Sequence, residues 1–361
     1  MRTTWGSNRR RWAGVALVVV VALLGTLASA VAAGGARDSE QRYAAQLMDR
    51  YTSDLGRAIT NEIQRYRDML TDMSIALGAQ SELTAGDFEW MTDKVSNRRL
   101  PGATSLAFVV STPDSGVGTL QSYWRGQGAT GLVLHPAALT SANGDHMFAV
   151  FTRTFDGVPV PAGIDLSAMP EAADTLEEAT FLGGFAASRA HILLKDRELP
   201  AAEQQLSFTF AVPIHRIGGA FRGWLTMGVH GRDLLTETLR TQSHGAVAAD
   251  LTDPTDMVER TIASATGAAP NSAGLDRTAQ VSAGLRTWKL EVHPTPKLLR
   301  ETDRGMVSST YAVGMTITLL LAALIGLLAG ARNRAMAKVD AATLALRGDI
   351  ERRQAVENRL R

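Results

Sequence analysis

Two unbroken apolar segments stand out in the pattern of hydrophobic and polar positions, one over residues 12–33 and the other over residues 306–331. About 20 apolar residues are enough for an α-helix to cross the roughly 30 Å of hydrocarbon in a bilayer. The pattern therefore predicts two transmembrane helices, with residues 34–305 lying between them on one side of the membrane.

Basic residues near the ends of these segments indicate their orientation. Arginines at residues 9–11 precede the first segment, whereas only Arg37 and Arg42 follow it closely, and a weaker bias around the second segment has the same direction. Basic residues concentrate on the cytoplasmic side of membrane helices. We therefore expect cytoplasmic ends at residues 1–11 and 332–361, a multi-pass protein of the inner or plasma membrane, and an extracytoplasmic middle.

The first apolar segment has a second interpretation, as a cleaved signal peptide. Its basic start, its apolar stretch and the small residues Ala28, Ser29 and Ala30 fit a signal sequence with a cleavage site. The apolar run continues to Ala33, which is longer than most signal sequences and favours a retained anchor. Both interpretations leave the middle of the chain outside the membrane.

A helical pattern covers residues 38–79, where apolar residues recur every three or four positions and polar residues fill the gaps. At about 1.5 Å per residue, such a helix is roughly 60 Å long. That length suits a stalk that rises from the membrane and pairs in its lower part with a second copy. The alternative is an amphipathic helix packed on its own domain, which we expect for the upper half.

The middle of the chain alternates short helical and strand patterns. Thr84 and Asp87 form a capping box that starts a helix over residues 85–96. Further helices are predicted over residues 170–179 and 232–241. Runs rich in β-branched and aromatic residues predict strands over residues 104–110, 147–152, 207–212, 221–229, 246–251, 258–265 and 286–293. The fold class is therefore α+β, with helices and an antiparallel sheet.

After the second apolar segment, residues 332–361 carry a helical pattern with an imperfect heptad seam. Val339 and Leu346 are apolar at seam positions, whereas Arg353 is charged. We expect a parallel coiled-coil linker in a homodimer. Because such a linker normally leads to an output module, we expect this chain to be the sensor portion of a longer protein or the product of a truncated gene.

Composition narrows the chemistry of the chain. The absence of cysteine excludes disulfides, thiolate metal sites and a cysteine nucleophile. The formal net charge of +1 gives no sign of nucleic-acid binding. The histidines show no metal-binding spacing, and Asp250, Asp253 and Asp256 surround Pro254, which favours a solvated turn over a calcium loop. We expect no metal and no cofactor.

Residues 126–131 match the dinucleotide-binding pattern Gly-x-Gly-x-x-Gly. That site needs a strand before the motif and a helix after it, so that the helix N-terminus meets the pyrophosphate. Pro136 argues against such a helix, and we interpret the motif as a glycine-rich turn. No catalytic constellation is visible, so the sequence assigns no catalytic residue and no enzymatic activity to this chain itself.

A set of short motifs occurs in a defined order between residues 60 and 239. In chain order these are Phe88, the small-residue turn at residues 97–102, the strand around Phe108, Gly-x-Asp at residues 163–165 followed by Pro170, the pair Ala179 and Thr180, the strand that ends in Val212, Pro213 and Ile214, and the closing pattern over residues 223–235. Together they resemble the CHASE family of extracytoplasmic sensor domains, although Phe181 stands where that family has a glycine.

The resemblance implies a long stalk helix that carries two PAS-like α/β units, a CHASE-like sensor domain over residues 60–239 and a membrane-proximal part over residues 240–305. In the family's cytokinin receptors, an aspartate of the Gly-x-Asp region hydrogen-bonds the ligand, and Asp165 occupies a similar place here. Those receptors have a threonine where this chain has Ala211, and Thr209 lies two residues earlier on the same face. This departure argues against cytokinin itself.

The predicted ligand-binding residues are therefore Asp165, Thr209 and Ala211, together with three aromatic residues. Phe108, Phe148 and Phe210 are candidates to line the pocket, and plain core packing is the alternative for each. Asp165 also has an alternative role, as an acid that stabilises the turn before the helix that follows it.

The sequence thus predicts a membrane-bound receptor that binds a small molecule outside the membrane and signals to a cytoplasmic output module. We favour a histidine kinase of a two-component system as the output, with a cyclic-di-GMP enzyme as an alternative. A second hypothesis is an ectodomain that senses a protein partner or the state of the envelope without a small ligand. A membrane-anchored enzyme is the third, and the identity of the ligand is not predicted.

Overall fold

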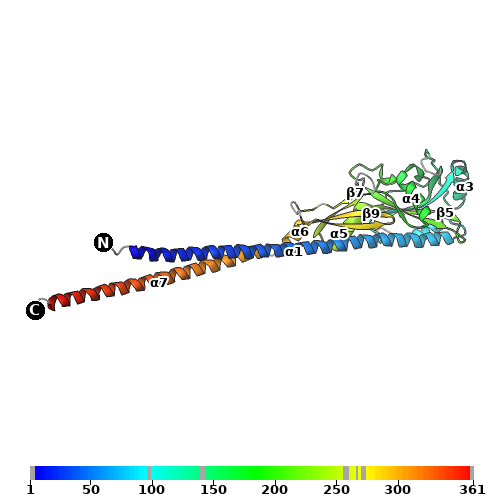
Figure 1. The fold of residues 1–361 in the computed structure, drawn as a ribbon. Coiled ribbons are helices and arrows are strands. Elements are labelled where there is room, and N and C mark those ends of the chain that lie inside the picture. The colour runs from blue at the N-terminus through cyan, green and yellow to red at the C-terminus, as the bar shows by residue number, and fades with distance from the viewer. Residues whose placement is uncertain are drawn as a thin grey trace. The chain divides into compact units, whose positions relative to one another are not determined.

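The computed structural model describes residues 5–95, 99–138, 144–254, 260–265, 267–269, 274–303 and 305–357. The chain divides into two compact units, whose elements are labelled in Figure 1. One unit joins Met1–Tyr43 to Thr302–Arg361, and the other is Ala44–Glu301. The helix α1 (Trp5–Ala79) belongs to both units.

The unit Ala44–Glu301 contains two antiparallel sheets. The five-stranded sheet has the order β2-β1-β5-β4-β3 and comprises β1 (Ala103–Pro113), β2 (Asp145–Thr154), β3 (Ala186–Ala187), β4 (Ser207–His215) and β5 (Phe221–His230). The four-stranded sheet has the order β7-β6-β9-β8 and comprises β6 (Val247–Asp253), β7 (Arg260–Ser264), β8 (Arg277–Ala283) and β9 (Arg286–Pro294). The helices between and around the strands are α2 (Ala85–Thr92), α3 (Val117–Gly126), α4 (Pro170–Leu182), α5 (Gly231–Ser243) and α6 (Pro296–Thr302), with short 3-10 helices at Asp114–Gly116, Leu166–Ala168 and Leu194–Asp196.

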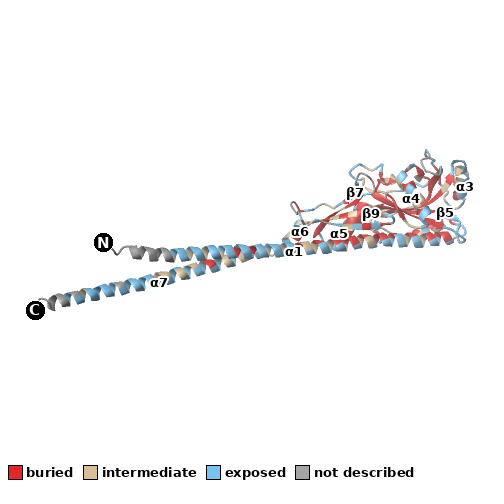
Figure 2. Ribbon diagram, viewed as in Figure 1, coloured by how far each residue is buried: buried red, intermediate tan, exposed pale blue. Residues whose placement is uncertain are grey.

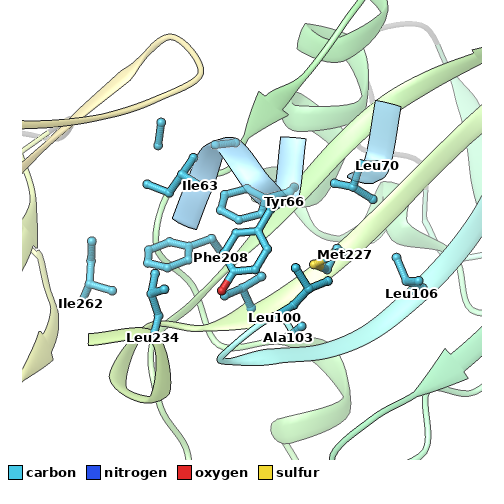
Figure 3. Packing of buried hydrophobic residues seen from close by; sticks show 14 of the residues in the cluster. Ile63, Tyr66, Leu70, Leu100, Ala103, Leu106, Phe208, Met227, Leu234 and Ile262 are labelled. Carbon is cyan, nitrogen blue, oxygen red and sulfur yellow. The ribbon is translucent and has the colours of Figure 1, made fainter. Parts of the chain in front are cut away.

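The apolar face of α1 forms the base on which the sheets pack. Its buried residues recur at helical spacing and are Met48, Leu55, Ile59, Ile63, Tyr66, Leu70 and Leu77. Figure 3 shows Ile63, Tyr66 and Leu70 of this helix beside Phe208 and Met227 of the five-stranded sheet. The predicted helical pattern is confirmed, and the part of the helix in this unit packs on its own domain.

The five-stranded sheet buries both of its faces, as the red strands of Figure 2 show. Side chains alternate between the two faces of a strand, so neighbouring residues enter different cores. On one face the sheet contacts α1, and on the other Ala107, Ala211 and Trp224 pack against Leu176 of α4. The Trp224 Nε1–H donates to the Leu176 carbonyl at 2.8 Å, which fixes α4 on this second face.

Aromatic stacking joins the two sheets. Phe208 of β4 and Trp288 of β9 are fully buried, and their ring centroids lie 4.3 Å apart. Phe208 also lies 6.1 Å from the ring of Phe210, which contacts Tyr66 of α1. Helix and both sheets therefore share one hydrophobic core.

In the other unit, α7 (Met306–Glu357) and the N-terminal part of α1 approach closely through small residues. A Cβ atom on Gly25 would lie 2.3 Å from the Thr318 hydroxyl oxygen, and one on Gly314 would lie 2.2 Å from the Ser29 hydroxyl oxygen. Small residues allow such close helix packing in membranes. Within the described residues, α1 and α7 are long and apolar enough to cross a membrane, judged by length and composition.

Two sequence predictions for the unit Ala44–Glu301 were incomplete or wrong. The helix predicted over residues 85–96 begins at Ala85 with the expected capping box but ends at Thr92, and residues 96–98 lie outside the described residues. Asp250 and Asp253 lie in β6 rather than in a solvated turn, and Asp253 is buried, because β6 pairs with strands on both sides. Asp256 lies outside the described residues.

The sequence predictions also lacked α3, β3, β8 and α6. The helix α3 ends at Gly126, so the glycine-rich motif at residues 126–131 follows a helix rather than a strand and is a turn, as predicted. Gly128 has a φ of 97°, a backbone conformation that glycine adopts without strain. Among the described residues, β8 pairs with β9 alone, and most of its side chains are exposed or half-buried, so it gave no apolar signal.

Arg222 of β5 holds the C-terminal end of α1. Its guanidinium Nη1 donates to the carbonyls of Leu77 and Gln80 at 2.8 and 2.7 Å, and its Nη2 donates to Ser81 O at 2.9 Å. The last turn of α1 has no basic residue of its own. A cation at this position satisfies carbonyls that the helix leaves without partners and complements the negative end of its dipole.

We expect Arg222→Gln to lower the free energy of unfolding of the Ala44–Glu301 unit by about 2–3 kcal/mol, because charged hydrogen bonds to several carbonyls are lost together. Urea unfolding of the detergent-solubilised full chain, followed by circular dichroism, measures this change. Arg216→Gln, at an exposed position in the turn after β4, is the matched control. An equal effect in both variants would contradict the capping role.

Candidate functional site

A small cavity of about 70 Å³ lies on the face of the five-stranded sheet that is opposite α1. Its floor comes from the strands β1, β2, β4 and β5 and includes Ser105, Ala107, Ala149, Thr209 and Thr226. Its cover comes from α4 and from the loops and 3-10 helices that hold Ile164, Leu166, Met169, Leu193 and Lys195. Most of the lining is apolar, with a few hydroxyl groups on the floor.

Gly228 lies in the floor of the cavity, where the cover packs against the sheet. Ser105, Gly228 and Thr209 form one row across β1, β5 and β4. A Cβ atom on Gly228 would lie 3.0 Å from a methyl group of Leu193 and 2.8 Å from the Thr104 hydroxyl. The glycine in the middle of the row therefore lets the Leu193 side chain of the cover pack closely on the floor.

His191 lines the cavity and contacts Thr209 of its floor. Burial lowers the pKa of His191, so its imidazole is neutral at pH 7. Its Nδ1 lies 2.9 Å from the Arg189 carbonyl, which requires the hydrogen to be on Nδ1. Nε2 then accepts a hydrogen bond from the Thr209 hydroxyl at 3.3 Å. A neutral, oriented imidazole thus stands at the edge of the cavity.

Asp165 is buried beside the cavity, between two residues that line it. Its Oδ1 accepts from the backbone N–H of Met147 and Ser167, both at 3.0 Å. Its Oδ2 accepts from Ala137 N–H at 3.1 Å and lies 2.6 Å from His146 Nδ1. Burial raises the pKa of Asp165, but these hydrogen bonds outweigh it and hold the pKa below its usual range.

The structure brings the predicted site residues together only in part. Thr209 lines the cavity, and Ala211 lies on the same face, two residues further along β4 and packed near α4. Asp165 is adjacent, but its carboxylate is turned toward backbone N–H groups. Phe108, Phe148 and Phe210 are fully buried in the core on the α1 face and do not line the cavity. The assignment of these residues to a ligand stays a prediction.

Sequence reasoning missed the cover of the cavity, which the segment 188–196 provides in part. His191, Leu193 and Lys195 line the cavity from this segment, which has no helical or strand periodicity to reveal its place. The only sequence signal was an adjacent pair of opposite charges at Lys195 and Asp196.

These two residues belong to an ionic network that joins the buried Asp196 to the exposed Asp156 and Asp233. The Lys195 ammonium lies 2.5 Å from Asp156 Oδ2 and 2.8 Å from Asp196 Oδ1. Asp196 Oδ2 lies 2.8 Å from His230 Nε2, and His230 Nδ1 lies 3.1 Å from Asp233 Oδ2. The network connects the cavity cover to the end of β5 and the first turn of α5, beside an open hollow of about 550 Å³.

Asp156, Asp196 and His230 are the one group of potential metal ligands found among the described residues. The Lys195 ammonium bridges the two carboxylates of that group, and the hydrogen bonds to Asp196 and Asp233 hold His230 protonated. Burial lowers the pKa of His230, but these two carboxylates raise it to about 9. The group is therefore an ion-pair network, and its donors do not fit a metal centre.

We expect Asp165→Asn to lower the free energy of unfolding by about 1–3 kcal/mol, because an amide cannot accept all the hydrogen bonds that the two carboxylate oxygens accept. Urea unfolding of the full chain measures the loss. Asp114→Asn is the matched control, since Asp114 also contacts His146, at 3.3 Å, but its side chain is 80 % exposed. A loss no larger than that of the control would show that the backbone contacts of Asp165 contribute little.

The His230 network predicts a pH dependence of stability. An unfolded histidine has a pKa near 6.5, and the folded value is raised to about 9. The folded state therefore binds this proton more tightly, so its stabilisation is complete below pH 6.5 and is lost as the pH rises through about 9. We expect the stability of His230→Gln to vary less over this interval than that of the native chain.

Unfolding free energies measured at a series of pH values test this expectation. His215→Gln, at an exposed position at the end of β4, is the control and should keep the native slope. Parallel curves for the native chain and His230→Gln would rule out the ionic network as the source of the dependence.

The chain is similar to one known domain family and to several solved structures. The family profile described as the CHASE domain matches residues 81–263. A search of the curated proteins returns no match. Similar solved structures include Methyl-accepting Chemotaxis protein X, with 12 % identity, a TM-score of 0.40, and coverage of 70 % of this chain and 96 % of that chain.

Two ligand-binding domains of amino acid chemoreceptors from Pseudomonas aeruginosa PAO1 are also similar. That of PctC, in complex with GABA, has 11 % identity and a TM-score of 0.41, and the match covers 68 % of this chain and 98 % of that chain. That of PctB, in complex with L-Arg, has 11 % identity and a TM-score of 0.41, with 77 % and 98 % covered. Because the family match spans half of the 361 residues and includes every residue that lines the cavity, the chain belongs to the CHASE domain family of extracytoplasmic sensors.

Proposed function

We propose that this protein is an extracytoplasmic receptor whose cavity on the five-stranded sheet binds a small molecule. The observation that carries the proposal is the cavity itself, an apolar space with hydroxyl groups on its floor and a neutral imidazole at its edge. Concave, mostly apolar sites with few oriented polar groups are typical of small-molecule binding. Thr209 is the residue on which we place most weight, and Asp165 then acts by holding the adjacent loop.

The membrane arrangement is part of the same proposal. Residues 12–33 and 306–331 are the two spans of an inner-membrane protein, which leaves the sheets outside and both chain ends in the cytoplasm. The apolar character of α1 and α7 supports this arrangement. The close contacts of Gly25 and Gly314 across these helices support a packed pair of spans.

Signal output and assembly complete the proposal. The two sheets correspond to PAS-like units, of which residues 60–239 form the CHASE-like sensor domain and residues 240–305 the membrane-proximal part. Residues 332–361 form a coiled-coil linker in a homodimer, and a histidine kinase is the favoured output. A ligand shifts the equilibrium between two arrangements of such a receptor only if it binds one arrangement more tightly than the other.

A thermal-shift screen of the full chain in lipid nanodiscs tests the binding of a small molecule. A ligand present at about 100 times its dissociation constant stabilises the fold by about 2.7 kcal/mol. We expect at least one hit, and we expect Ala149→Val, which narrows the cavity from β2, to abolish its effect. Ala45→Val, at a half-buried position on α1 outside the cavity lining, is the control.

The outcomes separate the hypotheses. A hit that survives Ala149→Val would keep the receptor and move its site away from the cavity. No hit across a broad library would favour a receptor that senses a protein partner or the state of the envelope.

A further inference from the structure

We infer that the ligand of this cavity is a small, uncharged molecule that donates a hydrogen bond to the cavity floor. The inference rests on the proposed function, because it names the chemical class of the ligand for the same cavity. It follows from three properties of the lining: its volume, its charge and the direction of its hydrogen bonds.

The volume sets an upper limit on size. An engineered protein cavity of about 150 Å³ with an apolar lining binds benzene. The present cavity of about 70 Å³ is smaller, so in this arrangement it admits only a short-chain molecule of a few non-hydrogen atoms. A bicyclic molecule, or an amino acid with an aromatic side chain, would enter the cavity only if the cover opened.

The charge of the lining excludes ions. Among the described residues, no carboxylate lines the cavity, so an ammonium group would find no counter-charge. Lys195 is the cation in the lining, and its ammonium is already held between Asp156 and Asp196. His191 is neutral. Because burying an unpaired charge is costly, a zwitterion, an anion and a cation are all disfavoured.

The direction of the hydrogen bonds on the cavity floor favours a ligand that is a hydrogen-bond donor. The Thr209 hydroxyl donates to His191 Nε2 at 3.3 Å, and the Thr226 hydroxyl donates to the Ala107 carbonyl at 3.3 Å. A hydroxyl has one hydrogen and two acceptor lone pairs. In this arrangement each of these floor hydroxyls presents an acceptor to a ligand.

The Ser105 hydroxyl is also an acceptor toward the cavity. Thr104 donates its hydroxyl hydrogen to the Gly228 carbonyl at 3.2 Å, so the Ser105 hydroxyl is the donor in their 3.4 Å contact. The three hydroxyl oxygens on the floor therefore all present lone pairs to the cavity. A ligand that carries an O–H or N–H group matches them, whereas a ketone or an ether meets acceptor against acceptor.

Four probes with equal numbers of non-hydrogen atoms test this inference: 2-butanol as a neutral donor, 2-butanone as a neutral acceptor, 2-butylammonium as a cation and glycine as a zwitterion. Ligand-observed NMR titrations use the full chain in lipid nanodiscs, with empty nanodiscs to subtract partition into lipid. We expect 2-butanol to bind about fivefold more tightly than 2-butanone, in line with one hydrogen bond. Binding of glycine and 2-butylammonium should not be detectable.

Substitutions then locate the contact. Thr209→Val removes the acceptor at nearly constant shape and should weaken 2-butanol binding about fivefold, whereas Thr209→Ser keeps the hydroxyl and should change it by less than about twofold. Thr226→Val repeats the measurement at a second hydroxyl, so that a folding defect in one variant does not decide the result.

Each other outcome overturns the inference in a recognisable way. Equal or tighter binding of 2-butanone would remove the donor requirement. Binding of glycine or 2-butylammonium that is abolished by Ala149→Val would overturn the uncharged class and leave the proposed function standing. If Ala149→Val changes the binding affinity of none of the four probes, the inferred ligand class is wrong. The library screen then tests the proposed function separately.

Discussion

The packing of one face of α1 against both sheets is the constraint on which the rest of the Ala44–Glu301 unit depends. Tyr66 shows how closely this contact is specified, because its ring lies 5.6 Å from that of Phe210 while its hydroxyl donates to the Pro101 carbonyl. Burial raises the pKa of Tyr66, so the phenol keeps its hydrogen and remains a donor. A helix held at its middle by such contacts and at its end by Arg222 cannot shift along the sheets without breaking several of them at once.

The segment 186–196 is the second point at which separate parts of this unit meet. The Arg286 guanidinium of β9 donates to Ala187 O at 2.5 Å, and Arg260 of β7 donates to Ala190 O at 3.2 Å. The Ala190 N–H donates to Asp253 of β6 at 3.4 Å. The same segment supplies His191, Leu193 and Lys195 to the cavity lining, so the cover of the cavity is bonded directly to the four-stranded sheet.

The sequence predicted those features that depend on local pattern and failed where distant segments decide the outcome. The face of α1, the capping box at Thr84 and most of the longer strands have regular apolar or polar spacing, which periodicity detects. Thr209 was named because the family resemblance picks out Ala211 and alternation puts Thr209 on the same face, and the structure places both on the face that carries the cavity. Phe210 lies between Thr209 and Ala211, so alternation already separates it from them. For Phe108 and Phe148 the face depends on where α1 and α4 pack, which no local pattern shows.

The cavity also depends on contacts between segments that are distant in the sequence, which local patterns do not predict. Its cover packs on the sheet where Leu193 meets Gly228 of β5, a contact between distant segments that no local pattern encodes. Its electrostatic character depends on Lys195 meeting Asp156 and Asp196, since an unpaired lysine at the same place would attract an anion instead. The ion pair also extends to His230 at the end of β5, where α5 begins. The charges that neutralise the cavity wall are therefore the charges that fix the cover to the body of the unit, and a charged ligand could engage them only by loosening that attachment.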